Sequence, residues 1–274
     1  MKGKNYSDWL VVSDIDGTLN NNRRHTPKVN TDTIDDFVHN KGGHFTLASA
    51  RNVQSLEPHY KNLPDVRTPA IVMNGAGIYD FSSEKMLWFN PIGSKGKEVI
   101  IKAMKKFPTL EIGIFTEDMI YLVRARISSP VMMALDNLRH KKVKSIHEVP
   151  EGNWGKVIFF CTPWNKNKVR EFALSQSDKS LAYIDTTVFS FDMVAYDTNK
   201  GTAILKLAKI LGIDKNNIGA IGDYYNDLDM LKTISHPACC KQAPKELHDI
   251  CEYTACHCND GAVADFINYI YKTY

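Results

Sequence analysis

Two aspartates, Asp14 and Asp16, stand at the end of an apolar run in the stretch Val11 to Leu19, which reads VVSDIDGTL. The run predicts a buried strand, and ligands of open α/β sheets bind outside the carboxyl ends of the strands. A carboxylate in that place can attack phosphorus and form an aspartyl-phosphate. A second acid two residues on can protonate the leaving group and later activate water. The spacing indicates phosphoryl-transfer chemistry, although a helix cap or a turn is the ordinary use of such a pair.

A second acidic stretch occupies the same kind of position later in the chain. Gly222-Asp223 follows a predicted strand over residues 217–221, and Asn226-Asp227 comes shortly after it. Three or four carboxylates at one sheet edge repel each other, and a hard divalent cation relieves that repulsion. Ligation by oxygen alone favours Mg²⁺ over zinc. We therefore expect a Mg²⁺ site, while Asn226 and Asp227 have the alternative of capping the helix that follows.

Four further residues are placed to hold a phosphate group. Gly17 and Thr18 allow backbone N–H groups to turn toward an anion. Ser49 follows the second predicted strand, and Lys200 begins a predicted helix. A lysine at a helix start is unfavourable for the helix dipole, which indicates a local reason for its presence.

The first part of the chain alternates between predicted strands and helices. Strands are expected over residues 9–13, 44–48 and 70–73, and helices from residue 26 and over 52–60. This β-α-β-α-β order predicts a parallel sheet with right-handed crossovers.

The middle of the chain has a different rhythm. Its predicted strands are short and adjacent, which indicates an antiparallel sheet with helices on one face. The basic run over residues 139–144 is typical of a solvated face. The strands are expected over 111–115, 119–123, 156–161, 181–184 and 188–194, and the helices over 94–107, from 128, and over 165–174.

The last part returns to strand-helix alternation. Ile204, Leu207, Ala208 and Leu211 fall on one helical face, and Gly212 is expected to end that helix. The predicted fold class is α/β: a Rossmann-like parallel-sheet core domain with an inserted α+β domain. We place the core at residues 1–83 and 191–274 and the insertion at residues 84–190.

The composition of the chain indicates a globular protein but excludes few functions. The chain has 274 residues, 43% hydrophobic and 24% charged, which is ordinary for a globular protein with a large core. Its 34 basic and 31 acidic residues are too balanced to predict a nucleic acid or a membrane as partner. Without a signal peptide or a long apolar stretch, a cytoplasmic protein is expected, as a monomer or small homo-oligomer.

Taken in order, these motifs resemble the haloacid dehalogenase-like superfamily, and in particular its Cof-type sugar-phosphate phosphatase branch. The resemblance spans nearly the whole chain. It rests on Asp14-Ile15-Asp16-Gly17-Thr18, Ser49, Lys200-Gly201 and Gly222-Asp223 with Asn226-Asp227, supported by Asn74-Gly75-Ala76, Asp229-Met230-Leu231 and Asp260-Gly261-Ala262-Val263.

The resemblance implies a role for each residue. Asp14 would be the nucleophile and a metal ligand, Asp16 the general acid and base with its carbonyl on Mg²⁺, and Asp223 the third protein ligand. Ser49 and Lys200 would hold phosphate. Asn226 and Asp227 would orient the metal waters and the lysine, and Asn74 either supports the site or shapes a turn with Gly75. The inserted domain would be a cap that selects a small phosphorylated metabolite, with hexose phosphates as the leading class and nucleotides or pyridoxal phosphate left open.

The sequence departs from the family pattern in two places. Ser49-Ala50-Arg51 stands where members usually carry Thr-Gly-Arg or Ser-Gly-Arg, and Cys240-Lys241-Gln242-Ala243 stands where Asn-Ala is usual.

Three alternatives to the phosphatase stay open. A phosphomutase would use the same nucleophile but need a bisphosphate activator. A catalytically silent binding protein would keep the fold without turnover. A zinc site through Cys256-His257-Cys258 with Cys239 or Cys240 lacks the usual spacing of two residues between cysteines.

Overall fold

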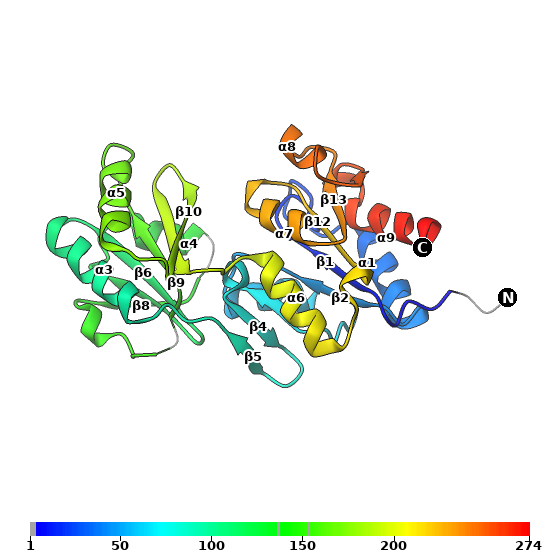
Figure 1. Cartoon of the computed structure of the whole chain (residues 1–274), viewed down its shortest axis with the longest axis horizontal. Helices are drawn as coiled ribbons and strands as arrows, with labels where there is room; N and C mark the ends of the chain where they lie inside the picture. The colour runs from blue at the N-terminus through cyan, green and yellow to red at the C-terminus, as the bar shows by residue number, and fades with distance from the viewer. Residues whose placement is uncertain (1–3, 136–137, 153) are drawn as a thin grey trace. The chain divides into compact units, whose positions relative to one another are not determined.

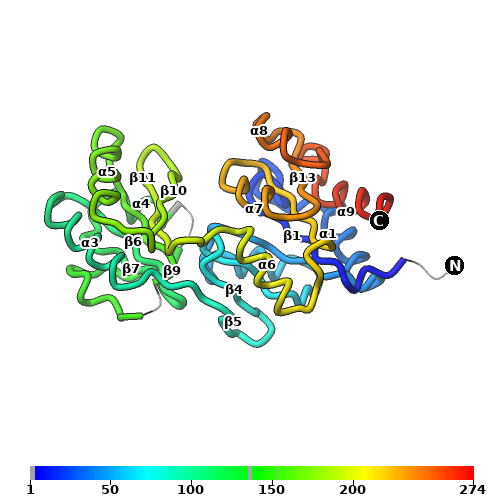
Figure 2. Tube along the Cα trace, viewed as in Figure 1, coloured from blue at the N-terminus to red at the C-terminus, as the bar shows by residue number. Residues whose placement is uncertain are grey.

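The computed structural model describes residues 4–135, 138–152 and 154–274, and the chain forms two compact units (Figures 1 and 2). The first unit comprises Met1–Ala50, Leu56–Leu87 and Asn199–Tyr274. The second comprises Arg51–Ser55 and Trp88–Thr198. The chain thus leaves the first unit and returns to it, and the expected α/β fold class with a parallel-sheet core is confirmed.

The second unit ends later than the predicted boundary after residue 190. Strand β11 (Ser190–Ala195) pairs along its length with β9 (Trp154–Phe160) and β10 (Leu181–Thr187), so its backbone hydrogen bonds tie it to the second unit. A cut after residue 190 would separate β11 from both partners.

A five-stranded parallel sheet forms the centre of the first unit, in the order β14-β13-β12-β1-β2. Strand β1 lies between β12 and β2, with Leu10 opposite Ile218 on one side and His44 on the other. All four residues of β1 are buried, because the parallel strand is covered on both faces, which explains its continuous apolar run. The strands are β1 (Leu10–Ser13), β2 (His44–Leu47), β12 (Ile218–Gly222), β13 (His236–Cys240) and β14 (Tyr253–Ala255).

Helices flank this sheet in pairs, with α1 against α9 and α6 against α7. Helix α9 approaches β12 closely because position 219 is glycine: a Cβ there would lie 3.0 Å from Cζ of Phe266. Gly212 ends α6 in the left-handed conformation, as predicted. The helices and short turns are α1 (Lys28–Asp35), η1 (Asp36–Asn40), α2 (Val53–Lys61), η2 (Met73–Gly75), α6 (Lys200–Leu211), η4 (Lys215–Asn217), η5 (Tyr225–Asp227), α7 (Leu228–Thr233), α8 (Lys245–His248), η6 (Cys258–Asp260) and α9 (Ala262–Thr273).

The third predicted strand does not join the parallel sheet as a full member. Strand β3 (Ala70–Val72) has one parallel bridge to the end of β2, between Ile71 and Ala48. Its ladder is antiparallel, with β4 (Gly77–Asp80), in a three-stranded sheet completed by β5 (Lys85–Phe89). Met73 and Asn74, both with positive φ, reverse the chain immediately after β3, so the strand pairs with the segment that follows it.

The second unit contains a six-stranded sheet in the order β10-β11-β9-β6-β7-β8. Its pairs are antiparallel except for β7 with β8, which run parallel. The remaining elements are β6 (Glu111–Thr116), β7 (Ile120–Val123), β8 (His140–Val143), α3 (Ser94–Lys106), α4 (Ser128–Leu135), η3 (Ile146–Glu148) and α5 (Lys166–Gln176).

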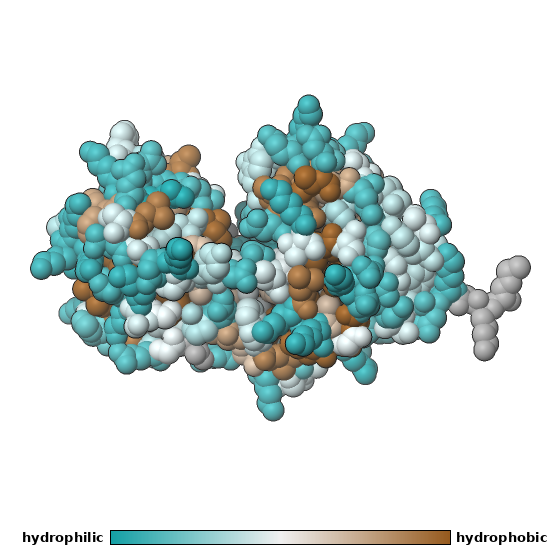
Figure 3. Space-filling view, viewed as in Figure 1, coloured by the Kyte–Doolittle hydropathy of each residue, from teal (hydrophilic) through white to brown (hydrophobic). Residues whose placement is uncertain are grey.

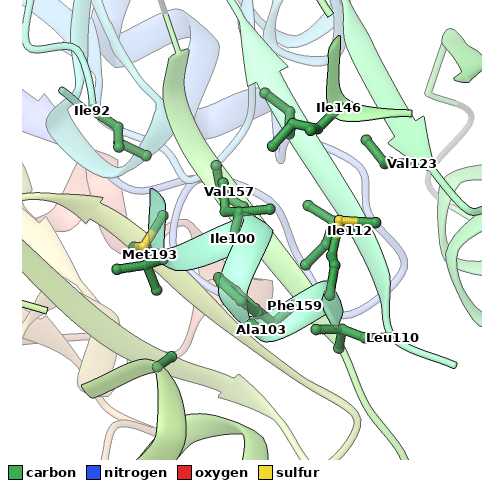
Figure 4. Packing of buried hydrophobic residues seen from close by; sticks show 14 of the residues in the cluster. Ile92, Ile100, Ala103, Leu110, Ile112, Val123, Ile146, Val157, Phe159 and Met193 are labelled. Carbon is green, nitrogen blue, oxygen red and sulfur yellow. The ribbon is translucent and has the colours of Figure 1, made fainter. Parts of the chain in front are cut away.

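An apolar core joins α3 and α5 to one face of this sheet (Figure 4). Ile100 and Ala103 of α3 pack with Ile112, Val157 and Phe159 of the strands. Full burial of a side chain of this size stabilises a fold by about 1.5–3 kcal/mol. The second unit therefore has a core of its own, built from the alternating residues of its strands.

The surface in view is mostly hydrophilic, with smaller apolar patches on both units (Figure 3). Among the described residues, no helix combines the length and apolar character needed to cross a membrane.

Candidate active site

Asp14 lies where the central strand ends. Its backbone N–H donates to the carbonyl of Ile221 in β12 at 3.0 Å, continuing the ladder by one residue. The chain then turns, with the N–H of Leu19 bonded to the carbonyl of Asp14 at 3.3 Å and that of Asn20 to Ile15 at 2.9 Å. Asp14 is buried and Asp16 is exposed, so the two carboxylates differ in solvent access.

Gly17 brings this turn against the second acidic stretch. Its φ of +85° is a conformation that side chains with a Cβ rarely adopt. A Cβ at this position would collide with the carboxylate of Asp223. The neighbouring Thr18 hydroxyl donates to Oδ1 of Asp223 at 3.2 Å. Glycine is therefore needed here both for the backbone conformation and for the close approach.

Lys200 joins the two acidic stretches. Its ammonium donates to Oδ1 of Asp14 and to Oδ1 of Asp227, both at 2.5 Å, and its side chain is 1% exposed. Lys200 is the first residue of α6, whose N-cap Asn199 accepts from the N–H of Thr202 at 2.8 Å. The helix start thus fixes the base of a side chain whose charge is buried among carboxylates.

Asp227 uses both carboxylate oxygens to hold its neighbours. Oδ1 accepts from Lys200, and Oδ2 accepts from the backbone N–H groups of Asp223 at 3.0 Å and Tyr224 at 3.4 Å. The side-chain amide of Asn226 also donates to Oδ1, at 3.4 Å. Asp227 is therefore a buried anchor that fixes the turn carrying Asp223.

The electrostatics of the cluster follow from burial and like charges. Burial raises the pKa of Asp14, the charges of Asp227 and Asp223 add to the rise, and Lys200 opposes it. Burial also raises the pKa of Asp223, to about 6, and the carboxylates of Asp227 and Asp16 contribute. Burial alone would lower the pKa of Lys200, but Asp14 and Asp227 raise it above its ordinary value. The cluster therefore contains one lysine that stays charged and more carboxyl groups than this lysine can neutralise.

Ser49 and Asn74 lie at the ends of the neighbouring strands β2 and β3. The N–H of Ser49 donates to the carbonyl of Ile71 at 3.0 Å, and the N–H of Asn74 donates to the carbonyl of Ser49 at 2.9 Å. Both residues are buried. The structure thus brings these two predicted residues to one another, with Asn74 in the left-handed turn that the sequence left as an alternative.

The residues present fit a divalent cation. One oxygen each of Asp14, Asp223 and Asp227 lies within 4.8 Å of the others. The oxygens of Asp227 already accept from Lys200 and two backbone N–H groups, so Asp14 and Asp223 have more coordinating capacity left. Burial raises the pKa of both carboxyl groups, because it destabilises their ionised forms. A bound cation would offset that cost.

Within the residues that the structure describes, this carboxylate cluster is the one group of three or more acidic, histidine or cysteine side chains spaced for a metal. The predicted alternative, zinc at Cys256-His257-Cys258 with Cys239 or Cys240, does not assemble there. Instead Cys239 contacts His248 at 3.3 Å, and Cys258 contacts Asn22 at 3.5 Å.

Gln242 is a contact of the site that the sequence did not single out. Its side-chain amide donates to the carbonyl of Gly17 at 2.6 Å, although 225 residues separate them. The indication in the sequence was the departure from the family pattern at Cys240-Lys241-Gln242-Ala243, the stretch where members usually carry Asn-Ala.

A family model of haloacid dehalogenase-like hydrolases matches residues 11–267. The chain belongs to this family and is a hydrolase, as expected from its motifs. A Streptococcus pyogenes protein named "Putative phosphatase" is 25% identical over 285 residues, covering 94% of this chain and 96% of its own.

Two solved structures share the fold. A haloacid dehalogenase-like hydrolase from Bacteroides thetaiotaomicron has a TM-score of 0.85 at 18% identity, covering 96% of this chain and 99% of its own. A sugar phosphatase of haloacid dehalogenase subclass IIB has a TM-score of 0.79 at 18% identity, covering 96% of this chain and 98% of its own.

Proposed function

We propose that this hydrolase is a Mg²⁺-dependent phosphatase that cleaves small phosphomonoesters through an aspartyl-phosphate on Asp14. The contact of the Lys200 ammonium with Asp14 at 2.5 Å is the observation that carries the proposal. It places a buried positive charge beside the carboxylate that would attack, where the negative charge of a phosphoryl group would arrive.

In the first half-reaction, an oxygen of Asp14 forms a bond to phosphorus as the ester P–O bond breaks. The leaving oxygen takes a proton from Asp16, whose carboxyl group is exposed and therefore accessible to a substrate. Lys200 faces the transferring group, while Ser49 and the N–H groups of the turn at Gly17 and Thr18 bind its remaining oxygens. Asp227 keeps Lys200 in place throughout.

In the second half-reaction, Asp16 accepts a proton from a water molecule, whose oxygen attacks phosphorus. The bond between phosphorus and Asp14 breaks, and inorganic phosphate leaves with the carboxylate restored. One residue thus serves as acid and then as base, which returns the enzyme to its starting protonation state.

Asp14, the carbonyl of Asp16 and Asp223 would hold the Mg²⁺ ion, with Asn226 supporting its water ligands. The ion would neutralise charge on the phosphoryl oxygens during transfer. Asp223 is half-buried and its turn is fixed by Asp227, so this ligand is positioned before an ion arrives.

The second unit is proposed to be the cap that selects the substrate, and sugar phosphates are the substrate class we favour. A structural neighbour of similar length is a sugar phosphatase, and the second unit has its own core and sheet. We further propose a cytoplasmic protein, monomeric or a small homo-oligomer, that acts on a phosphorylated metabolite and uses neither nucleic acid nor membrane.

Phosphate release from a panel of sugar phosphates, nucleotides and pyridoxal phosphate tests the proposal. Release is expected to need Mg²⁺ and to be absent for Asp14→Asn. Release only after addition of a hexose bisphosphate, with isomerised sugar phosphate as the product, would identify a phosphomutase instead. Binding of esters without turnover under every condition would identify a silent binding protein.

A further inference from the structure

Gln242 bridges the nucleophile turn and the C-terminal segment with both ends of its side-chain amide. Its Nε2 donates to the carbonyl of Gly17 at 2.6 Å, and its Oε1 accepts from the backbone N–H of Cys258 at 3.2 Å. The orientation of the amide follows from the partners, because a carbonyl needs a donor and an N–H needs an acceptor. A flipped amide would lose both bonds.

The contact adds a side-chain restraint to a glycine in a turn that backbone hydrogen bonds close on both sides. Gly17 has no side chain to hold it, and its φ of +85° lies in a region that glycine enters and leaves freely. On one side it meets the carboxylate of Asp223, and its carbonyl is held by Gln242. The peptide unit just before Gly17 carries the carbonyl of Asp16, so the orientation of that carbonyl depends on the backbone angles of Gly17.

We propose that Gln242 is a positioning residue that holds the Gly17–Thr18 peptide by its carbonyl, thereby fixes the backbone angles of Gly17 that orient the preceding Asp16 carbonyl, and so raises the affinity of the site for Mg²⁺. The inference rests on the proposed function, in which the Asp16 carbonyl is a metal ligand. Gln242 lies in the turn between β13 and α8, and both ends of its amide are bonded to backbone groups, so it is placed to act through Gly17.

A control is needed to separate the effect of the Gln242 bond from the effect of any bond between the C-terminal segment and the loop after β1. Asn259 also ties the C-terminal segment to the same loop, because its Oδ1 accepts from the N–H of Asn22 at 3.0 Å. This tether lies five residues beyond Gly17. If tethering alone mattered, its loss would affect the site as much as the loss of Gln242.

Mg²⁺ binding to the purified full chain, measured by isothermal titration calorimetry without substrate, tests the inference. Gln242→Ala loses both bonds, and Gln242→Glu keeps the shape and the acceptor for Cys258 but cannot donate to Gly17. Both variants are expected to weaken Mg²⁺ binding by about fivefold or more, the effect of one hydrogen bond. Asn259→Ala is expected to keep the parent affinity, and saturating Mg²⁺ is expected to restore kcat in the Gln242 variants.

Unchanged Mg²⁺ affinity in both Gln242 variants would overturn the inference and leave the proposed phosphatase intact. An equal loss in Asn259→Ala would also overturn it, since the effect would then be general. A parent protein that binds no Mg²⁺ would overturn the proposed metal dependence and this inference together. Urea unfolding of each variant shows whether it is folded at the temperature of the titration.

Discussion

Lys200 and Asp227 form a buried ion pair with 2.5 Å between Nζ and Oδ1, and neither side chain is more than 1% exposed. Burying two charges is costly, and a pair of this kind is stable only when both partners are present and fully hydrogen-bonded. Here Lys200 also reaches Asp14, and Asp227 also holds the turn at Asp223. The pair therefore links the proposed nucleophile to the proposed metal ligand.

Removing one partner of this pair is expected to destabilise the fold and to stop turnover. Asp227→Ala would leave Lys200 buried with one carboxylate in place of two and free the N–H groups of Asp223 and Tyr224. We expect the free energy of unfolding to fall by about 3–5 kcal/mol, measured by urea denaturation.

The control for this change is Asp229→Asn, on the exposed side of the next helix. Its free energy of unfolding is expected to stay within about 0.5 kcal/mol of the parent value. If the two variants were equally stable, Asp227 would not be what holds the turn that carries Asp223.

Gly17→Ala is expected to disable the site by a steric clash. The new Cβ would meet the Asp223 carboxylate and strain the backbone at a φ of +85°. Mg²⁺ affinity and kcat/KM should both fall by at least about tenfold, the effect of displacing a ligand of the ion. Calorimetry and steady-state kinetics measure the two effects.

Gly212→Ala is the control for Gly17→Ala, because it strains the backbone without creating a steric clash. Gly212 also has a positive φ, of +71°, but a Cβ there would have no neighbour within 4 Å. It should cost about 1–2 kcal/mol of stability and leave Mg²⁺ affinity unchanged. Equal losses of Mg²⁺ affinity in both variants would argue against the role given to the contact between Gly17 and Asp223.

The metal-free protein is expected to lose stability as pH rises from about 4 to above 6. Burial raises the pKa of Asp223 to about 6, from 3.8, so the folded state binds a proton that the unfolded chain has released. Stability then falls with rising pH through that window, and the raised pKa of Asp14 extends the fall to higher pH. Urea unfolding in EDTA at several pH values measures the slope.

Two comparisons test the origin of that slope. Asp223→Asn should have a shallower slope, because the group that titrates is gone. Mg²⁺ should stabilise the parent more at pH 7.5 than at pH 5, because protons compete with the ion for the carboxylates. A stability that rises with pH in EDTA would show that the buried cluster is already ionised.

Asp16→Asn should slow hydrolysis in proportion to the basicity of the leaving group. The variant keeps the backbone carbonyl but has no carboxyl proton to give. Sugar phosphates, whose leaving oxygens need a proton, should lose about 10²–10⁴ in rate. Phenyl esters with acidic leaving groups should lose less in the first half-reaction, measured as a burst of released phenol. Equal losses for all esters in that burst would contradict the role of Asp16 as acid.

Much of the core domain could be predicted because its strands are buried on both faces. The apolar runs before Asp14 and Asp223 identified β1 and β12, and parallel pairing of these strands brings their ends together. The ion pair of Lys200 with Asp14 could not be derived from the sequence, since it depends on where α6 begins relative to β1. Gln242 was missed for the same reason, because its partner Gly17 is 225 residues away.

Other elements lacked a local signal. Strand β8 reads His-Lys-Lys-Val, and this basic sequence predicts a solvated face rather than a strand. It forms a strand because it pairs with β7 at the edge of the sheet, where side chains can point to solvent. Strand β3 had the apolar residues of a parallel strand, but the positive φ of Met73 and Asn74 redirected its pairing to β4.

In the proposed mechanism Asp14 carries the phosphoryl group during turnover. Acid quenching during hydrolysis of the best ester, followed by peptide mass spectrometry, tests it most directly. We expect one phosphoryl group on the peptide that contains Asp14 and none in Asp14→Asn, which should also release no phosphate. Turnover at the parent rate by Asp14→Asn, or parent turnover with no phosphoryl group on that peptide, would contradict the account.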